Sequence, residues 1–248
     1  MRFAELTWPD IRKIDRQHSV VLCPIAACEQ HSHHLPTYTD AILVTAVAEG
    51  VEQAAGATTL LLPTLWLGAS HHHLRFGATL SVDAALHSQI LAGMLAPLLD
   101  DGFKRVLILN GHGGNIDTLH VALRLLQPKY SDRCLCGASY WELASEEFAA
   151  IAEGPQKDMG HACEYETSMM LHLRPDLVRK DEIKNDGLAA QAALRGLYLA
   201  DDLSQMSIRG CVGFPELASA LKGEQLLQAA ISRTKEVIEA LLKRNLPR

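Results

Sequence analysis

The sequence predicts a single α/β domain with a mostly parallel sheet and helices on both of its faces. Short β-branched runs alternate with longer helical stretches along the chain, which is typical of βα units around a parallel sheet. The length of 248 residues lies within the range of one such domain. No internal repeat, low-complexity tract or linker rich in proline and glycine marks a boundary. We therefore expect residues 1–248 to form one domain.

The predicted strands are short apolar runs, as expected for strands that are buried on both faces. They cover residues 19–26, 57–66, 106–110 and 133–140. The predicted helices cover residues 40–55, 81–101, 116–126, 164–173 and 216–244. The second of these helices begins at Ser81-Val-Asp-Ala and ends near Gly102, a glycine stop signal. Residues 174–212 give no clear pattern after Arg174-Pro175-Asp176, which ends a helix.

The composition excludes several classes of protein. Apolar residues make up 48% and charged residues 21% of the chain, which argues against disorder, collagen and coiled coil. The formal net charge of −6 argues against a nucleic-acid surface, which needs a basic patch. No apolar run is long enough for a membrane span, and the first residues, MRFAELTWPDIRK, lack the apolar stretch of a signal peptide. We expect a cytoplasmic protein that binds neither nucleic acid nor membrane.

Histidine is the unusual component, with twelve residues, and several of them follow the first predicted strand. The loop contains Glu29, His31, His33, His34 and Asp40 within twelve residues. In an extended segment Glu29, His31 and His33 face one side, so that a carboxylate and an imidazole can reach a shared ion. The alternative is a loop of solvated side chains in which Asp40 only caps the next helix.

A second candidate loop, Asn110-Gly-His-Gly-Gly-Asn115, lies between a predicted strand and a predicted helix. Its glycines let the backbone turn sharply and let a ligand come close to His112. A phosphate-binding loop is the alternative, but the segment has no lysine and matches neither nucleotide-binding pattern. We interpret His112 as a metal ligand.

Two further segments carry histidines. In His161-Ala-Cys-Glu-Tyr-Glu-Thr-Ser168, Glu164 and Glu166 are two residues apart, so only one of them can face a site from a helix. A capping or surface imidazole is the alternative for His161. His71, His72 and His73 cannot all point at one ion. All these segments follow predicted strands, and the carboxyl ends of strands in an open α/β sheet meet in one crevice.

Taken together, the motifs resemble those of the creatininase family of metal-dependent amidohydrolases. Glu29-Gln30-His31 with His34-Leu35-Pro36 and Thr39-Asp40 is similar to the family's EQHGPHLP…TD segment, and Asn110 to Asn115 to its NGHGGN loop. The remaining matches are His73-x-x-Phe76 with Thr79-Leu80-Ser81, His161-Ala with Glu166-Thr167-Ser168, and Gly210-x-x-Gly213-x-Pro215. The order of the motifs and their spread over nearly the whole chain make the resemblance specific.

The resemblance implies a set of residue roles. Glu29 and His112 would hold one metal ion, His31 and Glu166 a second, and Asp40 would bridge them. His161 would pass a proton to the departing nitrogen. Gln30 and Asn115 look like residues that orient the ligands, and the residues expected at the pocket or its rim are His33, His73 and Trp141. With one bridging hydroxide the three carboxylates balance two divalent ions, and ligands that are all nitrogen and oxygen suit zinc, manganese or iron.

The expected reaction is hydrolysis of a C–N bond in a small amide, lactam or formamide, by a homo-oligomer that the resemblance makes a hexamer. The sequence departs from the family at Ser32-His33, Gly77-Ala78 and Cys163. Gly113-Gly114 stands where creatinine hydrolases carry a Tyr-Glu pair, which disfavours creatinine as the substrate. Deformylation and peptide trimming stay open within the family. The alternatives from other classes are a non-catalytic metal-binding scaffold and a nucleotide-binding protein.

Overall fold

Four parallel strands form the central sheet of the computed structural model, which describes residues 1–185 and 199–246. The order across the sheet is β2-β1-β3-β4. The strands are β1 (Val20–Ile25), β2 (Thr59–Leu61), β3 (Arg105–Asn110) and β4 (Cys134–Ser139). In register, Val20 pairs with Thr59 on one side and with Arg105 on the other. The predicted parallel α/β architecture is confirmed.

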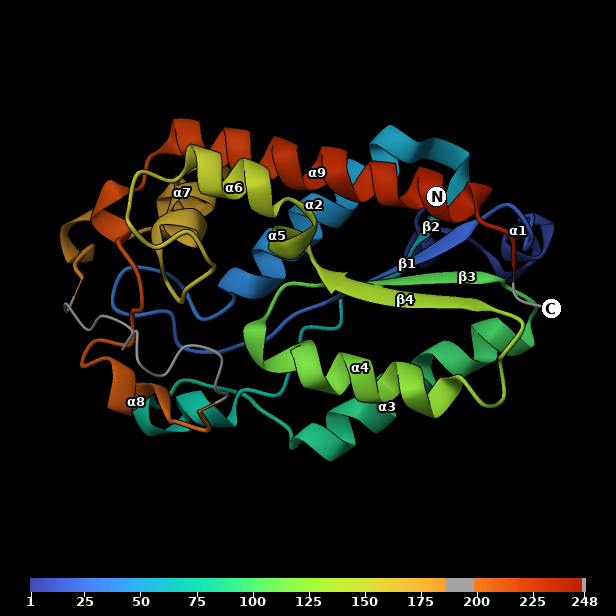
Figure 1. The fold of residues 1–248 in the computed structure, drawn as a ribbon, viewed down its shortest axis with the longest axis horizontal. Helices are drawn as coiled ribbons and strands as arrows, with labels where there is room; N and C mark the ends of the chain where they lie inside the picture. Colours follow the sequence, from blue (N-terminus) through green and yellow to red (C-terminus); the bar gives the residue numbers. More distant parts are fainter. Residues whose placement is uncertain (186–198, 247–248) are drawn as a thin grey trace.

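The helices lie on both faces of this sheet, as predicted. They are α1 (Trp8–Lys13), α2 (Thr39–Ala55), α3 (Ala84–Asp100), α4 (Ile116–Leu126), α5 (Tyr140–Leu143), α6 (Ser145–Ile151), α7 (Glu164–Leu173), α8 (Leu203–Met206) and α9 (Ala220–Lys243). Figure 1 shows α2 and α9 on one side of the strands and α3 and α4 on the other.

The alternation of side chains along the strands explains the two layers. Leu107 and Leu109 belong to the apolar cluster that includes α2 and α9, whereas Val106 and Ile108 belong to the cluster that includes α3 and α4. Every residue of β3 is buried. Because both faces are covered, the strands are continuous apolar runs, and this is why the sequence identified them.

Several predicted boundaries were wrong by a few residues. α3 is capped by Asp83, whose side chain accepts a hydrogen bond from the Leu86 amide, and not by Ser81. Residues 215–217 form a 3₁₀ turn, and α9 begins only after Ser219, whose hydroxyl accepts from the Lys222 amide. β2 is shorter than predicted, since a 3₁₀ turn at 56–58 precedes it and Pro63, which has no N–H, lies just beyond it.

Four helices were not predicted because they are short. α1, α5, α6 and α8 each span one or two turns, too few for a periodic pattern to emerge. In the unassigned segment 174–212 the structure describes two 3₁₀ turns and α8, and the alanine-rich part within 186–198 lies outside the described residues. None of the helices that the structure describes combines the length and apolarity needed to cross a bilayer.

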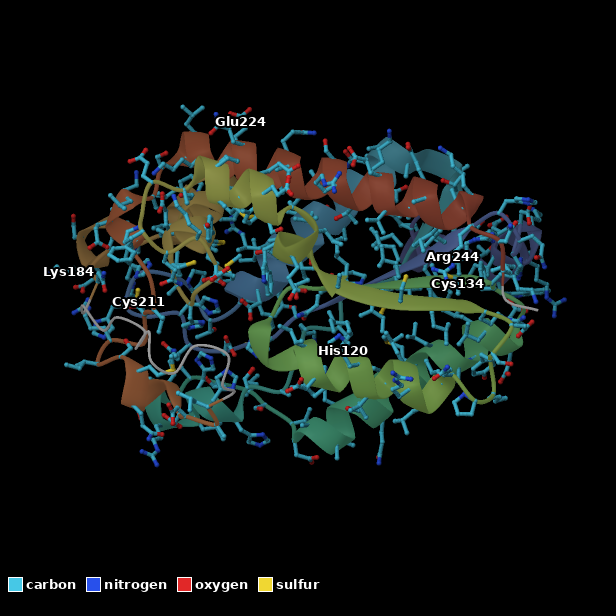
Figure 2. The ribbon with its side chains drawn as sticks, in the orientation of Figure 1. His120, Cys134, Lys184, Cys211, Glu224 and Arg244 are labelled. Atoms are coloured by element: carbon cyan, nitrogen blue, oxygen red, sulfur yellow. The ribbon has the colours of Figure 1, made fainter. Side chains whose placement is uncertain are left out.

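The site lies where the strands end. The loops after β1 and β3 carry Glu29 and His112, and β4 runs directly into the short helix that bears Trp141. Figure 2 shows His120, by contrast, on the outer surface of α4, where its side chain is exposed. The carboxyl end of the parallel sheet is therefore the place that gathers the chemically reactive side chains, as predicted.

Candidate metal centre

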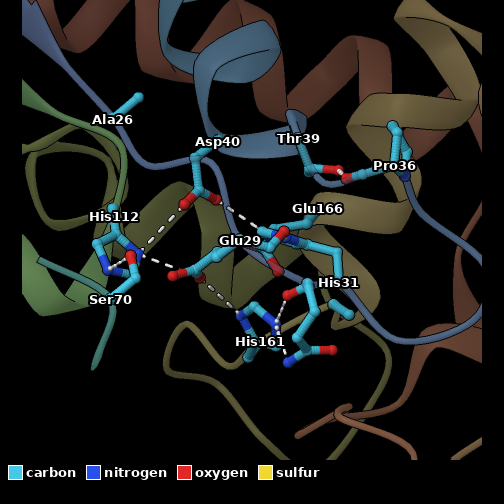
Figure 3. Close-up of polar contacts among 12 residues, drawn as sticks. Ala26, Glu29, His31, Pro36, Thr39, Asp40, Ser70, His112, His161 and Glu166 are labelled. Carbon is cyan, nitrogen blue, oxygen red and sulfur yellow. Dashed lines mark hydrogen bonds and ion pairs between the residues drawn. The ribbon is translucent and has the colours of Figure 1, made fainter. Parts of the chain in front are cut away.

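The carboxylate of Asp40 lies between two histidines that come from different loops (Figure 3). Its Oδ1 is 3.0 Å from Nε2 of His31, and its Oδ2 is 3.2 Å from Nδ1 of His112. Asp40 occupies the first turn of α2 and is 2% exposed. The N-cap position of α2 is taken by Tyr38, so the interpretation of Asp40 as the helix cap is wrong. The carboxylate instead turns toward the two imidazoles.

Two further buried carboxylates complete the cluster. Oε1 of Glu29 lies 3.2 Å from Nδ1 of His112. Oε1 of Glu166, on the first turn of α7, lies 3.7 Å from Nε2 of His31. The other oxygen of Glu166 accepts a hydrogen bond from the Cys163 amide, which holds the side chain in place. The structure thus brings together all five residues predicted to hold metal.

A hydrogen bond to a backbone carbonyl orients each of the two histidines, His31 and His112. Nδ1 of His31 donates to the carbonyl of Glu29 at 3.1 Å, and Nε2 of His112 donates to the carbonyl of Ala69 at 3.3 Å. A carbonyl oxygen can only accept, so each of these nitrogens carries a proton, and the other nitrogen of each ring faces the carboxylates. A hydrogen bond of this kind is what usually orients metal-binding histidines.

The polar atoms at the centre are buried and lack hydrogen-bond partners among the described residues. They are Oε1 and Oε2 of Glu29, Nε2 of His31 and Oδ2 of Asp40. Oε1 of Glu29, Nε2 of His31 and Oδ2 of Asp40 instead have ion-pair neighbours at 3.0–3.7 Å. Burying such groups unpaired is costly. Atoms of His31, Asp40 and Glu166 all lie within 4.8 Å of one another, as do atoms of Glu29, His72 and His112. These donors fit divalent cations bound by nitrogen and oxygen.

The electrostatics favour positive charge at the same place. Burial lowers the pKa of His112, but Glu29 and Asp40 outweigh this effect and raise the pKa to about 10. For His31, burial is likewise overcome by Asp40 and Glu166, and the pKa lies well above its usual value. Three buried carboxylates therefore attract cationic charge toward the space between them.

Gln30 organises a second layer around His73 and His161. Its Oε1 accepts from the Ser32 amide at 2.9 Å, which identifies Nε2 as the donor to Nδ1 of His73, also at 2.9 Å. Nε2 of His161 donates to the Gln30 carbonyl at 2.7 Å, which leaves Nδ1 facing Glu29 Oε1 at 3.5 Å. Burial lowers the pKa of His73 to about 2 and that of His161 well below its usual value, so both rings are neutral.

The glycine turn near the C-terminus supports this layer. Gly210 has a positive φ of 75°, and a Cβ there would collide with Oε1 of Gln30. Val212 pairs with His161 through two backbone hydrogen bonds of 2.8 and 2.9 Å. The turn therefore fixes both Gln30 and the backbone of His161.

Asn115 and Asn110 hold the loop of His112. Oδ1 of Asn115 accepts from the Ala69 amide at 3.0 Å, and its Nδ2 donates to the Ala26 carbonyl at 2.9 Å. Asn115 thus positions the residue whose carbonyl anchors His112. Asn110, which the sequence interpretation gave no role, accepts from the His112 amide and donates to the His112 carbonyl. Its place in the Asn110–Asn115 motif was the available signal.

A cavity of about 230 Å³ opens onto the cluster. Glu29, Asp40, His112, His161 and Glu166 line its polar floor, and its walls include His72, His73, Ile116, Trp141, Met159 and Leu203. The structure therefore places Trp141 and His73 at the cavity, where the sequence predicted them.

His33 is placed differently. Ser32 has a positive φ of 57°, which breaks the extended alternation that would have turned His33 toward Glu29. His33 is exposed, and its ring lies 3.8 Å from a carboxylate oxygen of Glu182 rather than at the cavity. The expectation of a pocket residue there was wrong. His34 is buried instead and contacts Oγ1 of Thr167 at 2.9 Å.

Glu164 turns away from the cluster, which distinguishes it from Glu166. Its carboxylate contacts Nζ of Lys222 at 2.7 Å and accepts from the amides of Glu153 and Gly154 at 2.9 Å each. Lys222 belongs to α9, 58 residues further along the chain. Lys222, the partner that holds Glu164 away from the cluster, is therefore distant from it in sequence.

Comparison with known proteins gives consistent results over nearly the whole chain. The family profile described as Creatininase: Creatinine amidohydrolase matches residues 4–238. The chain is 30% identical over 225 residues to the mycofactocin precursor peptide peptidase of Mycolicibacterium smegmatis, covering 89% of this chain and 85% of the relative. It is 28% identical over 249 residues to creatinine amidohydrolase of Pseudomonas putida, covering 94% of each. A solved creatininase variant of Zn-Zn type has a TM-score of 0.84 at 26% identity, covering 96% of this chain and 97% of that chain.

Proposed function

The chain belongs to the creatininase family of metal-dependent amidohydrolases, and on this premise we propose that it hydrolyses a C–N bond of a small amide, lactam or formamide at a pair of divalent metal ions. The observation that carries the two-ion proposal is the Asp40 carboxylate, whose two oxygens face His31 and His112 separately. Glu29 and His112 would hold one ion, His31 and Glu166 would hold the other, and Asp40 would supply one oxygen to each. Zinc is favoured by the solved Zn-Zn relative, and manganese or iron suit the same donors.

Divalent ions at such a centre polarise a carbonyl group and activate water near neutral pH. The protein contributes charge and orientation. Glu29, Asp40 and Glu166 supply three negative charges in a buried setting. The carbonyls of Glu29 and Ala69 fix the rings of His31 and His112.

His161 moves the proton. Its Nε2 is committed to the Gln30 carbonyl, so Nδ1, which faces Glu29 and the cavity, is the nitrogen that accepts a proton and returns it to the departing nitrogen. Its ring is neutral, as a proton acceptor must be. Trp141 and Ile116 form the apolar walls that exclude water from the substrate.

A peptide substrate is the second candidate, because a relative with 30% identity is named a precursor peptide peptidase. The apolar cavity walls would suit the side chain of such a substrate. We also propose that residues 1–248 form one domain of a cytoplasmic homo-oligomer, a hexamer by the family resemblance.

The test is metal analysis of the purified protein, followed by a panel of small amides, lactams, formamides and short peptides. We expect two divalent ions per chain and turnover that a chelator abolishes. His161→Ala should keep the ions and lose hydrolysis. A protein that retains both ions but hydrolyses no member of the panel would favour a non-catalytic metal-binding scaffold.

A further inference from the structure

His72 is a half-buried residue at the cavity to which the two-ion proposal gives no role. It lies in the 3₁₀ helix η3 (His71–Phe76), between the exposed His71 and the buried His73. Its ring stacks on that of His112 with centroids 5.7 Å apart and planes inclined by 12°. His72 therefore lies directly beside a residue of the metal centre.

A ring nitrogen of His72 is within reach of a shared ion. It lies within 4.8 Å of ligand atoms of both Glu29 and His112. Two atoms bound to one zinc ion at about 2.1 Å lie up to about 4.2 Å apart, so only a small side-chain adjustment separates this set from coordination. The carboxylate of Glu29 is fully buried, and its Oε1 already faces ring nitrogens of His73, His112 and His161 at 3.2–3.5 Å, so a cation beside it would be stabilised.

Gly114 makes room for this ring. A Cβ on residue 114 would lie 2.8 Å from Cε1 of His72 and 2.5 Å from Nε2 of His112. The same Cβ would lie 2.3 Å from the Ala69 carbonyl oxygen, so any larger residue at position 114 would displace this backbone segment as well as the imidazoles. Gly114 thus lets His72 stack on His112 at the cavity wall.

We propose that a ring nitrogen of His72 is a fourth protein ligand, beside Glu29, Asp40 and His112, to one ion of the pair. This inference rests on the proposed function. It makes the two halves of the centre unequal, because one ion has two imidazole ligands whereas the other, held by His31, Asp40 and Glu166, has one. Nitrogen donors favour zinc over manganese. The half that contains His72 is therefore the tighter and more zinc-selective one, and the other half keeps an open position.

The test measures metal affinity rather than turnover. The protein is loaded with zinc, titrated with a competing chelator and analysed for metal content. We expect the wild type to release its two zinc ions in two separate steps. His72→Phe, which keeps a stacking ring but removes both nitrogens, should weaken the tighter step by at least about 100-fold, more than the loss of an indirect partner would, and leave the weaker step unchanged. His71→Phe alters the exposed neighbour and is the matched control, with both steps as in wild type.

A zinc and manganese mixture gives a second readout. The wild type should take up one ion of each kind, and His72→Phe should take up more manganese. His72→Ala repeats both measurements should the larger ring impair folding. Unchanged affinities in these variants, with only a raised KM for substrate, would overturn the inference and make His72 a substrate contact. A wild-type protein that binds fewer than two ions would instead overturn the two-ion proposal itself.

Discussion

Substitutions of Asp40 test whether its carboxylate bridges two metal ions or is only a buried acid beside the site. Each of its oxygens faces a different histidine, at 3.0 Å from His31 and 3.2 Å from His112. Asp40→Ala removes one ligand from each ion at once. Asp40→Asn keeps the shape of the side chain and one ligating oxygen, but its NH₂ group cannot bind a cation. We therefore expect the two variants to bind different numbers of metal ions per chain.

The size of the effect follows from the number of ligands. Loss of an indirect, hydrogen-bonded partner of a ligand weakens metal binding by about 10- to 100-fold. Loss of a direct, charged ligand should cost at least about 100-fold per ion, which is about 2.7 kcal/mol for each. Asp40→Ala should therefore retain neither ion after gel filtration. Asp40→Asn should retain about one ion per chain, and neither variant should hydrolyse substrate.

Metal content by mass spectrometry and chelator titration are the assays, with activity on any substrate that the wild type turns over. Asp117→Ala is the control, since Asp117 lies in the first turn of α4 close to the site loop but is exposed. It should retain both ions and full activity. An Asp40→Ala protein that keeps both ions within a factor of about three of wild-type affinity would refute the bridging argument.

Three other substitutions test the surroundings of the centre. His161→Ala should keep both ions and lower kcat by about 10²- to 10⁴-fold, and unchanged turnover would remove it from the mechanism. Lys222→Met should lower the free energy of unfolding in urea by about 3 kcal/mol, because it leaves Glu164 buried with only its two backbone donors. Burial raises the pKa of Glu164, but Lys222 and these amides outweigh it and lower the pKa overall. The stability difference from wild type should thus be full above pH 4.5 and shrink as the pH falls through the lowered value; a difference that grows in acid would contradict this account. Gly210→Ala should cost about 1–3 kcal/mol in thermal unfolding and reduce kcat, since it strains the backbone and displaces Gln30; wild-type stability and rate would show that the turn does not hold Gln30.

The central sheet could be predicted because its signal is local. Residues 106–109 form a run of buried apolar side chains, and the fold places the loop that follows the strand at the carboxyl end of the sheet. Glu29 and His112 follow two neighbouring parallel strands, so the same rule predicts that they lie in one crevice. Short helices such as α5 and α8 were missed because one turn gives no periodicity.

Other features depended on contacts that a local pattern does not contain. The choice between Glu164 and Glu166 is made by Lys222, which α9 brings from a distant part of the chain. His33 was misplaced because Ser32 adopts a positive φ, a conformation that its sequence neighbours did not indicate. The orientation of Asp40 away from a capping position is set by the two imidazoles, and these meet only in the folded protein.

The most direct test of the two-ion centre is a crystal structure of the zinc-loaded protein with an anomalous difference map recorded at the zinc edge. We expect two peaks about 3.5–4 Å apart, with one oxygen of Asp40 next to each. A single peak, or two peaks without Asp40 between them, would contradict it.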